Sequence, residues 1–352
     1  MPPKELELLY CLASSPGRVF TREQLLNQMT FAEQAKLLTD AAYSTSIVPS
    51  VNKPASNDND GPMGNIKSEL GIVMPSEGIL ASTFNLEIME QAGKAFGEDS
   101  AHINYSSLYA PGVNIHRVPF GGRATEYYSE DPFLTGMASS QTVKGMQSLG
   151  VIPTVKHFAF NNEETNRNGI GIWMNEQEAR EIYLKPFEMT FRPSMGNAHG
   201  VMTSFNRAGC IWTSACPELM MNVLRNEWNF DGYSLTDMAA SNGAVYMTFD
   251  DGIFNGTDLF LGSGSETALD DYKGNVAFAQ RMREASHRVL YVFANYSRAM
   301  NGIASTDKIV PKTPWWEATL IALISVSAVA MAGSVCMLGL SIFKEKRQAE
   351  EK

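Results

Sequence analysis

Short apolar runs alternate with stretches of helical periodicity from residue 29 to residue 303. The apolar runs have the length and β-branched content of buried strands, and the stretches between them have the length of helices. An alternation of this kind is what a (β/α)8 TIM-type barrel requires, with an open doubly wound sheet as the alternative. We therefore predict a barrel over residues 29–303. The expected strands are 71–74, 108–115, 151–157, 200–204, 233–236 and 258–261; the expected helices include 85–96, 176–191, 217–228 and 276–296.

Polar side chains gather where several of these apolar runs stop. Lys156 and His157 follow VIPTV, Thr203 and Ser204 follow GVM, and Asp237 follows YSLT. In a barrel these places are the carboxyl ends of strands, where the loops that build active sites begin. The pattern predicts a site at that face of the barrel.

A second constraint lies near the end of the sequence, where residues 318–343 contain no charged side chain. At about 1.5 Å per helical residue, this stretch exceeds the roughly 30 Å hydrocarbon core of a bilayer. Trp315 and Trp316 precede it, as interfacial aromatics do, whereas a buried core helix would normally show a polar face. We predict a single transmembrane helix over residues 315–343, preceded by a linker at 304–314.

The orientation of that helix is argued from charge. Lys344, Lys346 and Arg347 lie in the charged tail, residues 344–352, and favour a cytoplasmic tail with the barrel on the extracellular side. The first apolar stretch, residues 6–12, is too short and too acidic for a signal peptide, which opposes export. The sequence predicts a single-pass membrane protein and leaves its orientation open.

Charge and cysteine content exclude other classes of function. The chain has 28 basic and 38 acidic residues, a net charge of −10, so nucleic acid is not an expected partner. The four cysteines form no CxxC pair and no HExxH occurs, so we expect neither a metal site nor a cofactor held by one. A bridge between Cys210 and Cys216 stays open beside the interpretation that both are free thiols.

Seven segments resemble glycoside hydrolase family 3 in its β-glucosidase-like branch, and they occur in the family's order. They are DGPMG (60–64), APGVNIHRVPFGGRATEYYSEDPFLTG (110–136), VKHFAFNNEETNR (155–167), REIYLKPFE (180–188), VMTSFNR (201–207), LRNEWNFDGYSLTDM (224–238) and GTDLFL (256–261). The resemblance implies a barrel domain that hydrolyses terminal β-D-glucosyl or similar residues with retention of configuration. The expected partners are a carbohydrate substrate and, through the terminal helix, membrane lipid.

The resemblance makes Asp237 the nucleophile that forms a covalent glycosyl-enzyme. This role needs an ionised carboxylate at a strand end, beneath the anomeric carbon. Without the resemblance, the N-cap of a following helix would be the more expected role of an Asp at this position.

The resemblance also assigns five side chains to the binding of sugar hydroxyls. Lys156 and His157 match the family's Lys-His pair, and Asp60 matches an acidic sugar contact. Arg123 and Arg167 match arginines whose planar donors hold two oxygens at once. The alternative for Lys156 and His157 is a surface lysine beside a buried structural histidine. For Asp60 it is an aspartate in a turn, and for the two arginines it is structural ion pairs.

The ion-pair alternative for Arg123 and Arg167 involves Glu126, Glu163 or Glu164, and the two roles are compatible. Two apolar side chains complete the predicted site. Phe205 replaces the Tyr of many relatives and stacks on a sugar without donating a hydrogen bond, and Met202 forms the floor or wall of the pocket or belongs to the core.

The group that protonates the leaving oxygen is not recognised. A retaining glycosidase needs a second carboxyl about 5–5.5 Å from the nucleophile. In β-glucosidase-like relatives a Glu of a separate sandwich domain supplies it, and the Asp-His dyad of the other branch does not occur in KHFAFNNEET. We therefore expect impaired hydrolysis, with a catalytically dead sugar-binding membrane protein as the alternative.

Residues 1–28 resemble the first helices of a winged-helix output domain of response regulators. The recognition helix and the wing of that family do not follow. We expect this segment neither to fold independently nor to bind DNA.

Overall fold

The computed structural model describes residues 26–65, 71–239, 245–300 and 315–350; side chains of the last stretch are described over 318–340. The chain divides into two compact units, Met1–Gly302 and Ile303–Lys352. The segment predicted to be winged-helix-like lies outside the described residues up to residue 25, as does the predicted linker, 304–314.

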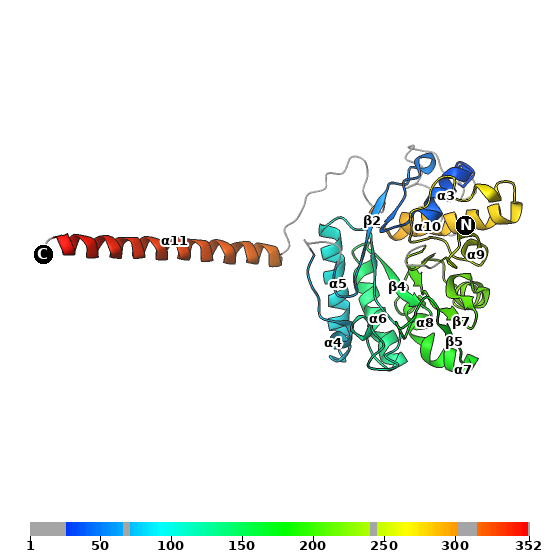
Figure 1. Ribbon diagram of the computed structural model, residues 1–352, viewed down its shortest axis with the longest axis horizontal. Coiled ribbons are helices and arrows are strands. Elements are labelled where there is room, and N and C mark those ends of the chain that lie inside the picture. Colours follow the sequence, from blue (N-terminus) through cyan, green and yellow to red (C-terminus); the bar gives the residue numbers. More distant parts are fainter. Residues whose placement is uncertain (1–25, 66–70, 240–244, 301–314, 351–352) are drawn as a thin grey trace. The chain divides into compact units, whose positions relative to one another are not determined.

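One sheet organises the first unit (Figure 1). Its order is β1-β2-β3-β4-β6-β9. From β2 onward each strand is parallel to its neighbour, and β1 pairs antiparallel with β2. The strands are β1 Ser44–Thr45, β2 Ser56–Asp60, β3 Ser107–Tyr109, β4 Ile152–Phe158, β6 Gly200–Thr203 and β9 Tyr233–Leu235.

The sheet curves toward closure beyond β9. Leu259 forms a parallel bridge with Leu235 of β9. Phe260 donates a backbone hydrogen bond to Leu38 and accepts one from Ala41, shortly before β1. The fold is thus α/β and barrel-like.

The prediction of eight parallel strands needs correction. In the described part of the chain, residues 258–261 contribute one bridge instead of a strand, and residues 71–74 contribute only the bridge between Val73 and Gly64. The strand expected over 108–115 stops at Tyr109, because Pro111 follows and has no N–H to extend the ladder.

Helices cover the outside of the sheet (Figure 1), and several begin at side-chain caps. Thr30 and Glu33 form a capping box at α3, and Asn85, Asp131 and Asn275 cap α5, α6 and α10. The helices are α3 Phe31–Thr39, α4 Glu77–Ala81, α5 Leu86–His102, α6 Pro132–Gln147, α7 Glu176–Glu178, α8 Lys185–Phe191, α9 Phe249–Phe254 and α10 Val276–Tyr296; π-helical turns are η3 Ala179–Tyr183 and η5 Glu218–Glu227, and 3-10 turns are η1 Pro49–Val51, η2 Ala124–Glu126, η4 Thr213–Ala215 and η6 Asp270–Tyr272.

A second, three-stranded sheet lies in the loops that follow β4 and β6. It consists of β5 Gly171–Ile172, β7 Arg207–Ala208 and β8 Ile211–Trp212. β7 and β8 form an antiparallel hairpin whose turn contains Gly209 at a φ of 59°. Glycine adopts this left-handed conformation without the strain that a Cβ would add, so it favours the turn.

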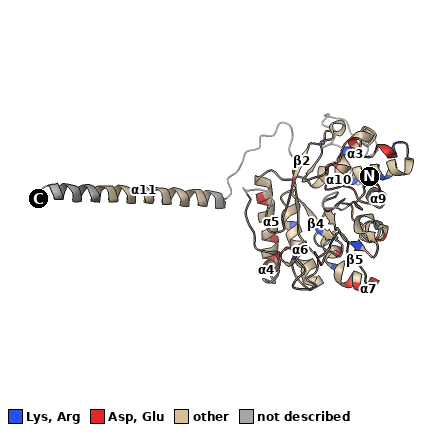
Figure 2. Ribbon diagram, in the orientation of Figure 1, with Lys and Arg blue, Asp and Glu red and all other residues tan. Residues whose placement is uncertain are grey.

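The second unit contains the helix α11, Trp315–Glu350. Its segment Ala318–Leu340 has 23 residues, a mean hydropathy of 2.2 and no buried residue, and is long and apolar enough to cross a membrane. Figure 2 shows no charged residue along this described part of the helix.

Candidate active site

Asp237 lies two residues beyond the end of β9, and neighbouring strands position it. Its N–H donates to the carbonyl of Thr203 in β6 at 3.2 Å. Its Oδ1 accepts from the N–H of Met238 at 2.8 Å, while its buried Oδ2 has no hydrogen-bond partner in the structure. The next described helix, α9, begins only at Phe249, so Asp237 caps no described helix. One carboxylate oxygen is therefore available to react.

The electrostatic surroundings of Asp237 have opposing effects. Burial raises the pKa of its carboxyl above the ordinary value. The N–H of Met238 and the positive charges of Arg123, Arg167 and Lys156 act in the opposite direction and favour the ionised form. Three of the predicted sugar-binding residues are thus the cations that stabilise the predicted nucleophile.

Lys156 connects the ends of two strands. This residue of β4 is 2% exposed, and its Nζ donates to Oδ1 of Asp60, the last residue of β2, at 2.6 Å. A carboxylate oxygen of Glu126 lies 3.5 Å from the same nitrogen. Asp60 is 32% exposed. The pair therefore combines a partly exposed carboxylate, which accepts hydrogen bonds, with a buried ammonium group, which donates them. This combination suits sugar hydroxyls, which both donate and accept.

His157 is held as a neutral ring. Arg123 Nη1 lies 2.8 Å from its Nε2, and since a guanidinium only donates, Nε2 is the acceptor. Its Nδ1 then carries the hydrogen and donates to Tyr127 Oη at 3.3 Å. Burial, with the charges of Arg123, Lys156 and Arg167, holds the pKa of His157 well below its ordinary value. The 3.7 Å approach of Nε2 to Asp237 Oδ2 is therefore not an ion pair.

The arginines form the ion pairs that were the alternative to sugar binding. Arg123 makes a double contact with Glu126, at 2.7 and 3.2 Å, and lies 3.7 Å from Glu164. Arg167 contacts the other oxygen of Glu164 at 2.8 Å. These carboxylates orient both guanidinium groups toward the site without occupying all of their donors. Glu163 does not take part: its carboxylate accepts from the N–H of Thr165.

Phe205 and Met202 lie in the interior. Phe205 is 3% exposed, and Cζ of the Arg167 guanidinium lies over its ring, 4.2 Å from the ring centre. Met202 packs in the core cluster with residues of β3, β4 and β9. Phe205 thus supports Arg167, and its ring face is not open for a sugar.

Two site residues escaped the sequence prediction. Tyr127 donates to the carbonyl of Asn161 at 3.0 Å, and the Asn161 amide donates to Tyr127 Oη and to Glu164. Both lie inside the family-like segments 110–136 and 155–167, so their place in those segments was the available signal. They fix the ring of His157 and the carboxylate of Glu164.

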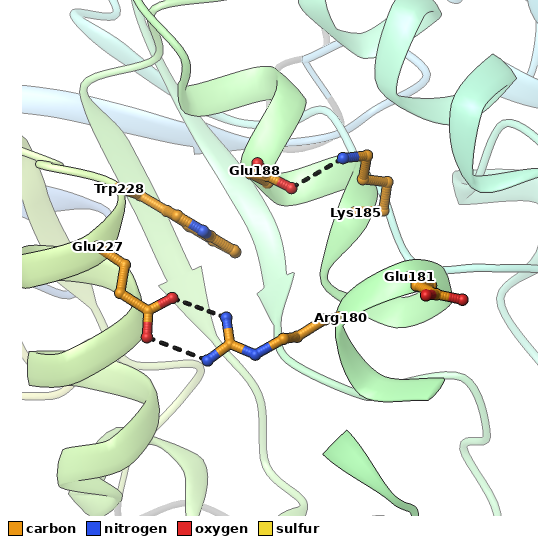
Figure 3. A pocket seen from close by; sticks show the side chains of 6 residues that line it. All are labelled: Arg180, Glu181, Lys185, Glu188, Glu227 and Trp228. Atoms are coloured by element: carbon orange, nitrogen blue, oxygen red, sulfur yellow. Dashed lines mark hydrogen bonds and ion pairs between the residues drawn. The ribbon is translucent and has the colours of Figure 1, made fainter. Parts of the chain in front are cut away.

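A hollow on the helical layer is a different feature (Figure 3). Its volume is about 420 Å³, and it is lined by Arg180, Glu181, Lys185, Glu188, Glu227 and Trp228. Arg180 is bonded to both oxygens of Glu227, and Lys185 to Glu188. These charges neutralise each other, and none of the predicted site residues lines the hollow.

In the part of the chain that the structure describes, no group of three or more His, Cys, Asp or Glu side chains is arranged to hold a metal ion. Cys210 and Cys216 are free thiols.

Comparisons with known proteins show which family this sequence is similar to. A family profile described as "Glycosyl hydrolase family 3 N terminal domain" matches residues 23–269. A β-glucosidase of Ruminococcus albus is 39% identical over 191 residues, which are 53% of this chain and 20% of that protein. β-Glucosidase A of Butyrivibrio fibrisolvens is 36% identical over 248 residues, 67% of this chain and 30% of the relative.

The fold has solved counterparts. The structure of β-glucosidase 3B from Thermotoga neapolitana in complex with α-D-glucose superimposes with a TM-score of 0.71 and 31% identity, covering 79% of this chain and 43% of that one. The chain thus spans less than half the length of these relatives. The resemblance of residues 1–28 to a winged-helix domain finds no support in these comparisons. Since the family profile covers more than half of the sequence, the chain belongs to glycosyl hydrolase family 3.

Proposed function

We propose that the chain cleaves terminal β-D-glucosyl or similar residues through a covalent glycosyl-enzyme on Asp237. The observation that carries the proposal is the carboxylate itself. It lies beyond a strand end with Oδ2 unpartnered, and three cationic side chains act on its charge. A buried, oriented carboxylate of this kind is what displacement at an anomeric carbon requires.

The other predicted residues have roles that follow from their contacts. Oδ2 of Asp237 forms a bond to the anomeric carbon as the bond to the leaving oxygen breaks. Asp60 and Lys156 bind hydroxyls remote from that carbon, while Arg123 and Arg167 add donors and keep Asp237 ionised. Neutral His157 orients Arg123 and offers no proton to Asp237.

Protonation of the leaving oxygen is the demanding step for this chain. The carboxylates that approach the cations of the site, Asp60, Glu126 and Glu164, are each tied in an ion pair. General acid assistance is typically worth about 10²–10⁴ in rate, and alkyl sugar oxygens depend on it most. We therefore infer slow hydrolysis of disaccharides and retained reactivity toward activated aryl glucosides.

We predict that dinitrophenyl β-D-glucoside glycosylates the purified chain, because the phenolate leaves without protonation. Slow hydrolysis then lets the covalent species accumulate. Intact-protein mass spectrometry should show one added glucosyl unit, absent from Asp237→Asn, which keeps the shape of the side chain and removes the nucleophile. Azide, which needs no general base, should speed release of the sugar. Asp231→Asn, at an exposed carboxylate paired with His199, is the matched control and should still form the adduct.

Two other outcomes of these experiments would change the proposal. Brisk cellobiose hydrolysis would show that an acid exists, and Glu163→Gln and Glu164→Gln are then the variants to assay. Glucose binding without any adduct would favour the alternative, a catalytically dead sugar-binding protein.

We also propose that α11 anchors the protein in a membrane as a single span. The supporting observations are its 23-residue apolar segment, with no buried residue, and the basic residues Lys344, Lys346 and Arg347 that follow. Positive residues favour the cytoplasmic side, which would put the barrel outside the cell.

A further inference from the structure

Glu77 is a buried carboxyl group to which the proposed mechanism gives no role. It is the first residue of α4 and is 1% exposed. Its Oε1 accepts from the N–H of Gly112 at 3.2 Å, and its buried Oε2 has no hydrogen-bond partner among the described residues. Burial of a carboxyl group with one oxygen unpaired costs free energy, so packing alone does not explain a glutamate at this position.

Gly112 is the point where Glu77 meets two residues of the candidate active site. The residues before and after Gly112 exchange backbone hydrogen bonds with Lys156, at 3.0 and 2.8 Å. A Cβ added to Gly112 would lie 2.1 Å from the carbonyl oxygen of Glu126. The turn at Gly112 therefore lies directly against the backbone of both residues, and Glu77 holds the buried N–H of this turn.

The surroundings of Glu77 favour its protonated form. Burial, with the carboxylate of Glu126, raises the pKa of Glu77 well above its ordinary value, whereas the N–H of Gly112 and the charge of Lys156 lower it. The hydroxyl of Tyr128 is a further titratable group that interacts with this carboxyl. Glu77 is therefore held as a neutral acid.

The charge state of Glu77 affects the site because one ammonium group serves several carboxylates. Nζ of Lys156 lies 2.6 Å from Asp60 and 3.5 Å from Glu126. An ionised Glu77 would be a third carboxylate attracting the same ammonium group, and would weaken its hold on Asp60. A neutral Glu77 leaves the charge of Lys156 to the pair proposed to bind sugar hydroxyls.

We propose that Glu77 is a positioning residue for sugar binding, a neutral acid that holds the Gly112 turn against Lys156 and Glu126 and leaves the Lys156 charge to Asp60. The inference rests on the proposed function, because that function assigns sugar hydroxyls to Asp60 and Lys156. Since Glu77 acts through these residues, its removal should change the affinity for the sugar more than the maximal rate of glycosylation.

Three variants test this role in the full chain, in a detergent without a sugar head group. Glu77→Gln keeps an acceptor oxygen and is uncharged, Glu77→Met removes the acceptor at similar size, and Glu77→Asp withdraws it by one methylene. Calorimetry gives the Kd of glucose, and mass spectrometry gives the half-saturating concentration and maximal rate of adduct formation with dinitrophenyl β-D-glucoside. Glu77→Met and Glu77→Asp should raise both constants about tenfold and change the maximal rate less than about twofold. Glu77→Gln should stay within about twofold of wild type in all three.

Glu33→Met is the matched control. Glu33 also lies near the start of a helix and accepts a backbone N–H from a distant loop, that of Ser50 at 3.1 Å. Its other hydrogen bonds come from Thr30, which is not a residue of the site. This variant should lower the midpoint of thermal unfolding without changing either constant.

The protonated state of Glu77 has a test of its own. Wild type must keep a proton on Glu77 to stay folded, so its stability falls as pH rises above about 4.5, the ordinary pKa of the group. Glu77→Gln has no such requirement. The midpoint of thermal unfolding of Glu77→Gln relative to wild type should therefore rise with pH, and a constant difference overturns the neutral acid.

The outcomes separate this inference from the proposed function. Equal constants in wild type, Glu77→Met and Glu77→Asp overturn the role of Glu77 and leave the proposed function intact. Equal losses in Glu77→Gln and Glu77→Met also overturn it. Glucose affinity that is lost in Glu77→Met and retained in Glu77→Gln, with no adduct in wild type, supports the role of Glu77 and contradicts the nucleophile. A wild-type chain that neither binds glucose nor forms the adduct overturns both. If Glu77→Met does not fold, Glu77→Asp decides in its place.

Discussion

At the residue scale, the candidate site consists of charges that depend on one another. Glu126 and Glu164 orient Arg123 and Arg167, and these arginines favour the ionised form of Asp237. Burial alone would keep the Asp237 carboxyl protonated to higher pH. The reactivity proposed for Asp237 therefore depends on its charged neighbours as well as on its own carboxyl group.

This dependence predicts the pH profile of glycosylation. Only the ionised carboxylate attacks, so the adduct forms more slowly as pH falls through the raised pKa of Asp237. Arg167→Leu removes a charge that lowers this pKa and should move the acid limb to higher pH. Arg167→Lys keeps the charge and should leave the limb near its wild-type position. The rate of adduct formation with dinitrophenyl β-D-glucoside is measured against pH; an unmoved limb in Arg167→Leu contradicts the proposed coupling.

At the element scale, the packing of α5 against α6 depends on two glycines. A Cβ at Gly93 would lie 2.1 Å from the carbonyl oxygen of Thr142, and one at Gly145 would lie 2.2 Å from the carbonyl oxygen of Glu90. Both obstructing atoms belong to backbone, which cannot swing away as a side chain can. The two helices thus approach each other at positions where no other residue fits.

We predict that Gly93→Ala destabilises the protein. The backbone must shift, at a cost of about 1–3 kcal/mol or more, which outweighs the roughly 1 kcal/mol gained in helix propensity. Gly78→Ala in α4 is the matched control, since its added Cβ would meet nothing nearer than 3.6 Å. It should be neutral or stabilising by about 0.5–1 kcal/mol. Thermal unfolding followed by circular dichroism compares the two; equal midpoints would refute the packing argument.

At the scale of the whole molecule, the two units differ in whether their apolar side chains are buried or exposed. The barrel unit buries most of its large apolar side chains, whereas the described side chains of α11 are apolar and exposed. Water does not stabilise an exposed apolar segment of 23 residues, and hydrocarbon does.

The membrane proposal predicts that the full chain sediments with membranes and resists extraction by alkaline carbonate. A chain ending at Pro314 should stay in the supernatant after ultracentrifugation. Val326→Arg combined with Val329→Arg places two charges near the middle of the span, at about 2.5–3.5 kcal/mol each, and should weaken insertion. Lys36→Arg, at a partly exposed position of α3, is the control. Full-length protein in the supernatant without detergent would refute the span.

Much of the element pattern followed from the sequence, because it depends on local periodicity. The helix expected at 276–296 is α10, and the strands expected at 151–157, 200–204 and 233–236 are β4, β6 and β9 within a residue or two. β2, with the sequence SNDND, was not expected. Asp58 and Asn59 are buried in this strand, and Asp58 interacts with Lys53 and Tyr109. Because these partners come from other parts of the chain, the local sequence gives no sign that so polar a segment is a buried strand.

Residue type, order and spacing are enough to identify the family, the strand ends that carry Lys156, His157 and Asp237, and the apolar span. The assembled fold determines which charges pair, that His157 is neutral, and that Phe205 lies beneath Arg167. It also decided that the sheet has fewer than eight parallel strands in the described residues. These properties depend on distances between residues far apart in the chain, and burial and charge at such distances are set only when the strands have assembled.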